Sequence, residues 1–80
     1  MNEIKILYFA SLREQRGLSS ESIKTECRTA LELWKSISLE HKLEMNLEIL
    51  KVAANDEYVD FNYHLKNGDQ IVFIPPVAGG

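Results

Sequence analysis

The fold is decided by one stretch near the C-terminus, Gln70-Ile71-Val72-Phe73-Ile74, which stops at Pro75-Pro76. Apart from its first residue, the stretch is β-branched or aromatic, a composition typical of a strand buried on both faces. Proline lacks the N–H that a sheet needs, so the proline pair ends the strand and holds the following chain extended. The stretch therefore predicts a strand at the centre of a sheet, with a stiff exit.

A second apolar strand is predicted near the other end of the chain, over Ile4–Phe9 (IKILYF). Apolar side chains occur on both of its alternating faces, which is typical of a central strand rather than an edge strand. We expect it beside Gln70–Ile74 in the middle of the sheet, because pairing the two most apolar strands buries the most surface.

One main helix is predicted in the middle of the chain. Thr29 and Glu32 form a capping box, the signature of a helix start. Apolar residues then recur at spacings of three and four and form an inward stripe: Ala30, Leu31, Leu33, Trp34 and Ile37. The helix reaches Ser38, and the pattern leaves open whether it continues through His41 and Leu43.

Shorter elements fill the remaining sequence. The patterns predict one helical turn over Ser11–Gly17 with Ser11 as a possible cap, an outer strand over Glu21–Glu26, a strand over Ile49–Ala54, a turn at Asn55–Glu57, a short strand at Tyr58-Val59 and a turn at Lys66–Asp69. One helix covering one face of a mixed sheet is an α+β arrangement, and this element order is that of the β-grasp, or ubiquitin-like, architecture. We expect a β-grasp domain over residues 1–74 and an extended tail over residues 75–80.

Composition excludes several classes of function. The net charge is −3 over 80 residues, whereas nucleic-acid binding needs a basic face. The apolar runs are far shorter than the roughly 20 residues of a membrane span. One cysteine cannot form an internal disulfide, and with two separate histidines it makes no usual metal site. We therefore expect a cytoplasmic protein that binds no metal or cofactor of its own.

Single reactive side chains do not form a catalytic site in the sequence. Cys27 lacks a neighbouring histidine that would activate it, so we interpret it as a small buried apolar residue. His41 and His64 are isolated, and we interpret both as surface or packing residues. Trp34 lies on the apolar stripe of the helix and is expected in the core.

The tail Pro75-Pro76-Val77-Ala78-Gly79-Gly80 is the exception. Six extended residues reach roughly 20 Å, and two glycines at the tip let the chain thread a tunnel that a side chain would block. The reactive group at the end is the α-carboxylate of Gly80, which is ionised at neutral pH and inert until it is activated. An enzyme that attached AMP to it would make its carbonyl open to a sulfur or amine nucleophile.

Several stretches now resemble one known family. They are Ile6–Ala10 with Leu12-Arg13-Glu14 and Gly17, then Val52–Asn55, then Leu65 with Gly68-Asp69, and finally Ile74–Gly80. In these stretches the chain resembles the ubiquitin-like sulfur-carrier family that includes the small subunit of molybdopterin synthase. The middle of the chain, residues 20–48, shares only the helix pattern, and Ala78 stands where the family often has Ser or Thr.

The resemblance implies a role for the tail. A ubiquitin-activating-like adenylyltransferase using ATP and Mg²⁺ would adenylate Gly80, and a sulfur-donating enzyme would convert it to a thiocarboxylate. The tail, Gly79 included, would enter the large catalytic subunit of molybdopterin synthase and give sulfur to cyclic pyranopterin monophosphate, forming the molybdopterin dithiolene. Two carriers would flank a dimer of large subunits in a heterotetramer, and the nucleotide and catalytic pockets would belong to the partners.

Other functions fit the same tail. A sulfur carrier for thiazole or another product differs only in its acceptor, a ubiquitin-like modifier would form isopeptide bonds with lysines, and a plain interaction domain would not need the two glycines. For any docking partner we expect contacts near the root of the tail, on the sheet face that the helix leaves uncovered. The candidate residues are Phe9, Phe73, Ile74, Pro75, Pro76, Val77 and Ala78.

Overall fold

Seven elements follow one another in the computed structural model, which describes residues 1–76. In chain order they are β1 (Asn2–Tyr8), α1 (Ala10–Arg16), β2 (Ser20–Thr25), α2 (Ala30–His41), β3 (Lys51–Ala54), β4 (Glu57–Val59) and β5 (Gln70–Ile74). Within this part of the chain, neither helix has the length and hydropathy needed to cross a bilayer. The element order confirms the predicted α+β class.

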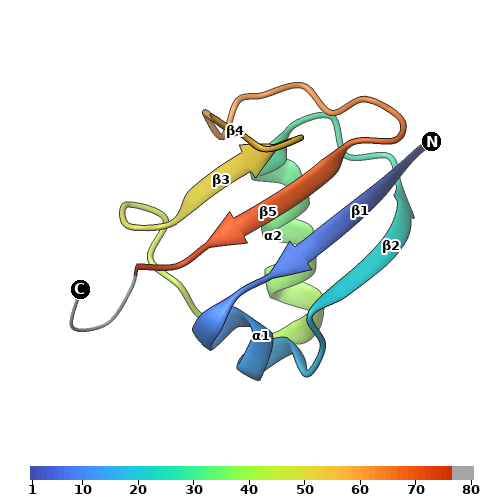
Figure 1. The fold of residues 1–80 in the computed structure, drawn as a ribbon. Helices are drawn as coiled ribbons and strands as arrows, with labels where there is room; N and C mark the ends of the chain where they lie inside the picture. Colours follow the sequence, from blue (N-terminus) through green and yellow to red (C-terminus); the bar gives the residue numbers. More distant parts are fainter. Residues whose placement is uncertain (77–80) are drawn as a thin grey trace.

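The five strands form one mixed sheet in the order β2-β1-β5-β3-β4. Strands β1 and β5 are parallel neighbours, and all other neighbouring pairs are antiparallel. Helix α2 crosses one face of the sheet, while α1 lies at the end to which β1 and β5 both point (Figure 1). The predicted central pair and the β-grasp architecture are therefore confirmed.

The core lies between α2 and one face of the sheet. Ile4, Ile6 and Tyr8 of β1 are buried beneath the helix, and the ring centroids of Trp34 and Phe73 are 5.1 Å apart across this layer. The predicted capping residue holds the helix start, since Thr29 Oγ1 accepts a hydrogen bond from the Glu32 N–H at 3.2 Å. The predicted position of Trp34 in the core is thus confirmed.

Element boundaries differ from the sequence predictions by one or two residues, as at the start of β3, and the structure defines the end of α2, which the pattern left open. Helix α1 begins after Phe9 without a side-chain cap, so the predicted cap at Ser11 is wrong. Helix α2 ends at His41, where Lys42 adopts a left-handed conformation with φ of 56°. Strand β3 begins two residues later than predicted, because the Ile49 N–H bonds the Asn46 carbonyl in a turn instead of a neighbouring strand.

A buried carboxylate joins the ends of three elements opposite the tail. Asp69, just before β5, accepts hydrogen bonds from Asn55 Nδ2 at 2.9 Å, Tyr63 Oη at 2.9 Å and the Lys66 N–H at 2.8 Å. Burial by itself would raise the pKa of Asp69, but these three donors outweigh it and hold the pKa below its ordinary value. Asn55 in turn bonds the N–H of Gln70, so the β3–β4 turn is fixed to the start of β5.

We expect Asp69→Asn to lower the free energy of unfolding at pH 7 by about 1–3 kcal/mol, because at least one donor loses its acceptor. Since the pKa of Asp69 is lower in the folded chain than in the unfolded chain, its contribution is complete above about pH 4 and is lost as the pH falls through the folded value. Urea unfolding at pH 7 and in acid measures both effects.

The matched control is Asp56→Asn, because Asp56 is exposed in the neighbouring turn. This substitution is expected to change stability by less than about 0.5 kcal/mol. Equal stability of the Asp69→Asn variant and the wild type at pH 7 would contradict the structural role of Asp69.

Candidate functional site

The tail leaves the sheet from the end of its central strand. Ile74, the last residue of β5, lies opposite Lys51 of β3, and beyond it Pro75 is buried whereas Pro76 is exposed. Because β1 runs parallel to β5, with Tyr8 opposite Phe73, the chain after β1 emerges at this same end. Phe9 and helix α1 therefore lie beside the root of the tail (Figure 1). The predicted site residues Val77, Ala78, Gly79 and Gly80 lie outside the described residues.

The sheet face opposite α2 carries an apolar row next to this root. The strand registers place four residues side by side across β1, β5, β3 and β4: Leu7, Val72, Ala53 and Tyr58. Phe9 and Ile74 lie on the side of the row nearer the tail. Together these six side chains line most of a shallow hollow of about 260 Å³. We call these six residues the open-face patch.

The open-face patch is confined to the tail half of the sheet. The next row away from the tail is polar and consists of Ser22, Lys5 and Gln70. Within the patch, Tyr58 is 74% exposed and Phe9 is 48% exposed, although both are large and apolar. Exposed apolar side chains that gather on one part of a surface are typical of a docking site. The exposed apolar side chains of this face thus gather near the root of the tail.

The structure separates the predicted docking residues into two groups. Phe9 and Ile74 lie on the uncovered face, as expected. Placement of Phe73 on that face is wrong: its side chain is 0% exposed and packs against Trp34 and Phe61 under α2. The reason is the two-residue period of a strand, which turns Phe73 to the opposite face from Val72 and Ile74.

Four patch residues escaped the sequence prediction: Leu7, Val72, Ala53 and Tyr58. A signal for Leu7 was present, because in Ile4–Phe9 it shares a face with Phe9 rather than with the core residues. Val72, Ala53 and Tyr58 fall into one row with Leu7 only through the strand order and register. No pattern within a single strand contains that information.

A polar cluster anchors α1 next to the tail end of the sheet. Glu21 of β2 accepts hydrogen bonds from Tyr8 Oη at 2.6 Å and from Arg16 Nε and Nη2 at 3.0 and 2.8 Å. The hydrogen bonds from Arg16 lower the pKa of Glu21, and burial raises the pKa of Tyr8. At neutral pH the tyrosine is therefore neutral and the carboxylate ionised. In these states Tyr8 donates and Glu21 accepts, so the hydrogen bonds that hold α1 to β2 are kept.

The isolated cysteine and histidines do not join the tail root. Cys27 is half-buried rather than buried, packs against the edge of the core, and lines a hollow with Asn2 and His64 at the end of the sheet opposite the tail. His64 is exposed. His41 ends α2 and lies 3.3 Å from the carboxylate of Glu40. Among the described residues, these side chains are therefore not part of the open-face patch.

Comparisons with known proteins agree with this architecture. The model of the ThiS family matches residues 6–80. The molybdopterin synthase sulfur carrier subunit of Homo sapiens is 36% identical, over 98% of this chain and 94% of the human protein.

Solved structures are similar over the whole domain. A putative molybdopterin converting factor subunit 1 from Pyrococcus furiosus superposes with a TM-score of 0.80 at 29% identity, covering 96% of this chain and 100% of that one. A chain in the complex of subunits 1 and 2 of the molybdopterin-converting factor from Helicobacter pylori has a TM-score of 0.68 at 28% identity, covering 98% and 99%. The fold and the length of the domain are thus those of these carriers.

Truncation of the two aromatic residues near the tail root is expected to change the stability of the domain by very different amounts. Phe73→Ala should lower the free energy of unfolding by about 3–5 kcal/mol, because it leaves a cavity under α2. Phe9→Ala should change it by less than about 0.5 kcal/mol, because the side chain is half exposed. Chemical unfolding of both variants measures the difference, and equal losses would contradict the assigned faces.

Proposed function

The chain belongs to the ThiS family, and from this premise we propose that it is the sulfur carrier of a molybdopterin synthase, with a thiocarboxylate at Gly80 as its sulfur donor. The observation that carries the proposal is the position of the open-face patch. The exposed apolar residues surround the root of a tail that ends in two glycines, and the rest of the same face is polar. A domain that delivers its last residue into another protein needs this arrangement.

The proposed chemistry takes place at one carbon atom. The Gly80 carboxylate attacks the α-phosphorus of ATP, which forms an acyl-adenylate and releases pyrophosphate. A sulfide-equivalent nucleophile from the sulfur-donating enzyme then adds to the carbonyl and expels AMP, leaving the thiocarboxylate. ATP and Mg²⁺ belong to the activating enzyme. A carbonyl flanked by glycine alone can be reached closely from both sides, so two different enzymes can act on it in turn.

The partners follow from the same geometry. In the Helicobacter pylori complex, a similar chain is assembled with subunit 2 of the molybdopterin-converting factor. We propose that this chain docks likewise on a large catalytic subunit, as two carriers on a dimer, and that the thiocarboxylate gives its sulfur to cyclic pyranopterin monophosphate there. The net charge of −3 favours a partner with a basic surface.

Incubation with ATP, Mg²⁺, the activating enzyme and a sulfur source should increase the intact mass of the chain by the exchange of one oxygen for sulfur. Fragmentation should place the change at Gly80. Omission of ATP is the control, because the carboxylate is inert without adenylation. A chain that stays at its original mass under complete conditions would contradict the proposed function.

Substitution of Gly79 by valine should abolish sulfur transfer with little effect on folding. The branched side chain next to the reactive carbonyl blocks entry into a narrow tunnel, while residue 79 follows the last strand, β5, in the sequence. Molybdopterin formation and thermal unfolding measure the two effects. Normal product formation by Gly79→Val, or by a chain that lacks Gly80, would refute the role of the tail.

A further inference from the structure

A loop beside the tail exposes apolar side chains that the open-face patch does not include. It connects α2 to β3 over residues 42–50, and its two ends are anchored by the buried residues Leu43 and Leu50. At its tip Leu47 is 37% exposed and Ile49 is 47% exposed. Exposure of two large aliphatic side chains on one short tip is unfavourable in water. We call Leu47 and Ile49 the loop tip.

Specific hydrogen bonds hold this loop in place although it has no regular secondary structure. The side-chain amide of Gln15 in α1 bonds both backbone groups of Glu44: it accepts from the N–H at 2.7 Å and donates to the carbonyl at 3.3 Å. The side chain of Asn46 accepts a hydrogen bond from the Glu48 N–H at 2.9 Å, and the backbone carbonyl of Asn46 accepts one from the Ile49 N–H at 3.1 Å. The loop tip is therefore presented in one defined conformation, which lowers the entropic cost of binding.

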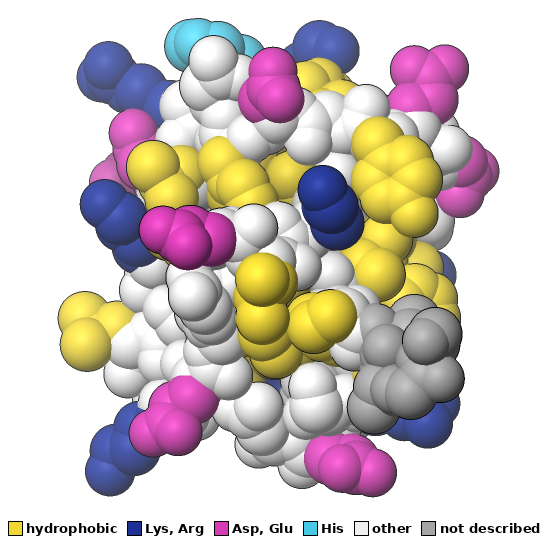
Figure 2. All heavy atoms as spheres, turned by 90° about the vertical axis from the view of Figure 1, so that its left-hand side faces the viewer, with side chains coloured by type: hydrophobic (Ala, Val, Ile, Leu, Met, Phe, Trp, Pro, Cys, Tyr) yellow, Lys and Arg dark blue, Asp and Glu magenta, His cyan; other side chains and the backbone are white. Residues whose placement is uncertain are grey.

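The loop tip lies at the end of the molecule from which the tail leaves. Lys51 and Ile74 are opposite each other in antiparallel strands, so the chain just before Lys51 lies beside the chain just after Ile74. Figure 1 shows this loop and the end of β5 at the same end of the molecule, and Figure 2, which faces that end, shows hydrophobic side chains across its middle.

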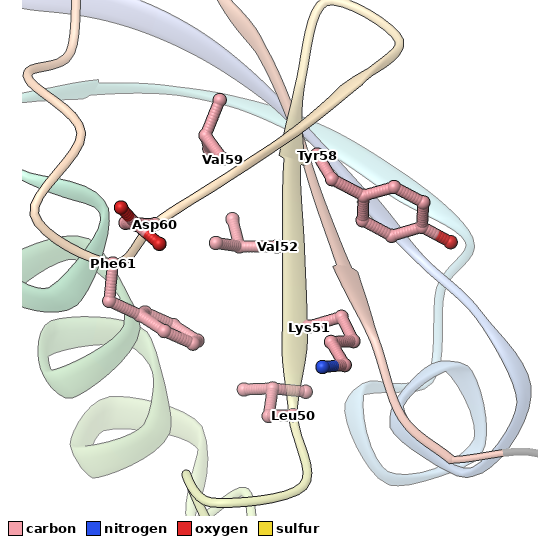
Figure 3. A pocket seen from close by; sticks show the side chains of 7 residues that line it. All are labelled: Leu50, Lys51, Val52, Tyr58, Val59, Asp60 and Phe61. Atoms are coloured by element: carbon pink, nitrogen blue, oxygen red, sulfur yellow. The ribbon is translucent and has the colours of Figure 1, made fainter.

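An apolar groove continues from the loop along the edge of the sheet. It has a volume of about 640 Å³ and begins at Leu50, where the short strand β4 leaves β3 uncovered. Its walls differ: Val52 and Phe61 face the helix side of β3, whereas Lys51 and Tyr58 face the other side (Figure 3). Tyr58 also belongs to the open-face patch, so the groove adjoins the patch at this edge of the sheet, with Lys51 and Asp60 as its charged lining residues.

The length of the tail decides which partner covers this surface. Four residues separate Pro76 from the reactive carbonyl of Gly80, a reach of at most about 14 Å. An enzyme that holds this carbonyl in its active site must therefore bring the mouth of its tunnel against the tail root. The mouth then meets both neighbours of the root, the open-face patch and the loop tip.

We propose that the loop tip, Leu47 and Ile49, is a contact surface for the large subunit of molybdopterin synthase, which thereby encloses the tail root from two sides. This inference rests on the proposed function, since it needs a partner that takes in the tail. Gln15 acts as a positioning residue, because its side chain fixes the loop backbone at Glu44.

The test is the affinity of the double variant Leu47→Ser/Ile49→Ser for the large subunit of the same organism, measured by calorimetry. Loss of two buried aliphatic contacts should raise the Kd about tenfold or more. The matched control is Leu39→Ser, which removes a similar apolar surface from α2, where Leu39 is 84% exposed. The control should leave the Kd unchanged, and thermal unfolding should show that both variants are folded.

A second variant tests the positioning role. Gln15→Ala should accelerate hydrogen exchange at the Glu44 amide and weaken large-subunit binding by a smaller factor, while the intact-mass assay still shows thiocarboxylate formation. If the Glu44 amide exchanges as slowly in Gln15→Ala as in the wild type, Gln15 does not position the loop.

The outcomes separate the two proposals. If the wild-type chain forms the thiocarboxylate and binds the large subunit, but the double variant binds equally well, the loop tip is not part of the interface. The proposal for the loop tip also fails if the double variant is adenylated more slowly but binds the large subunit with unchanged affinity. The activating enzyme would then be the partner of the loop. If the wild-type chain neither gains sulfur nor binds, the proposed function itself fails.

Discussion

The parallel pairing of β1 and β5 is the constraint on which the rest of the structure depends. It joins the two most apolar strands at the centre of the sheet and makes them end at the same side. The chain that follows β1 becomes α1, and the chain that follows β5 becomes the tail. One pairing thus places Phe9, the α1 anchor and the tail root together, although about sixty residues separate Phe9 from Pro75 along the chain.

Strand alternation then gives the central strands two separate tasks. On one side Ile71 and Phe73 fill the core under α2, and on the other Val72 and Ile74 belong to the open-face patch. The core supplies the stability that a small domain can reach. The other face of the sheet can remain apolar near the root of the tail, where a partner can bury it.

In the proposed function the molecule presents the end of its tail to partner enzymes. The polar clusters of the described residues, around Asp69 and Glu21, bond to neighbouring elements and hold them in register. The proline pair at Pro75 and Pro76 and the apolar surroundings of the root fit the proposed carrier function.

The sequence by itself determined the strands, the main helix and the exit of the tail, because each depends on neighbouring residues: alternation in Ile4–Phe9, the cap at Thr29, the proline pair after Ile74. It also identified Phe9 as a docking candidate. Only the tertiary structure assigned Phe73 to the core, joined Leu7, Val72 and Tyr58 in one patch, and brought the loop tip beside the tail. Faces and neighbours across strands are set by register and by the side on which the helix packs, and both are properties of contacts between distant segments.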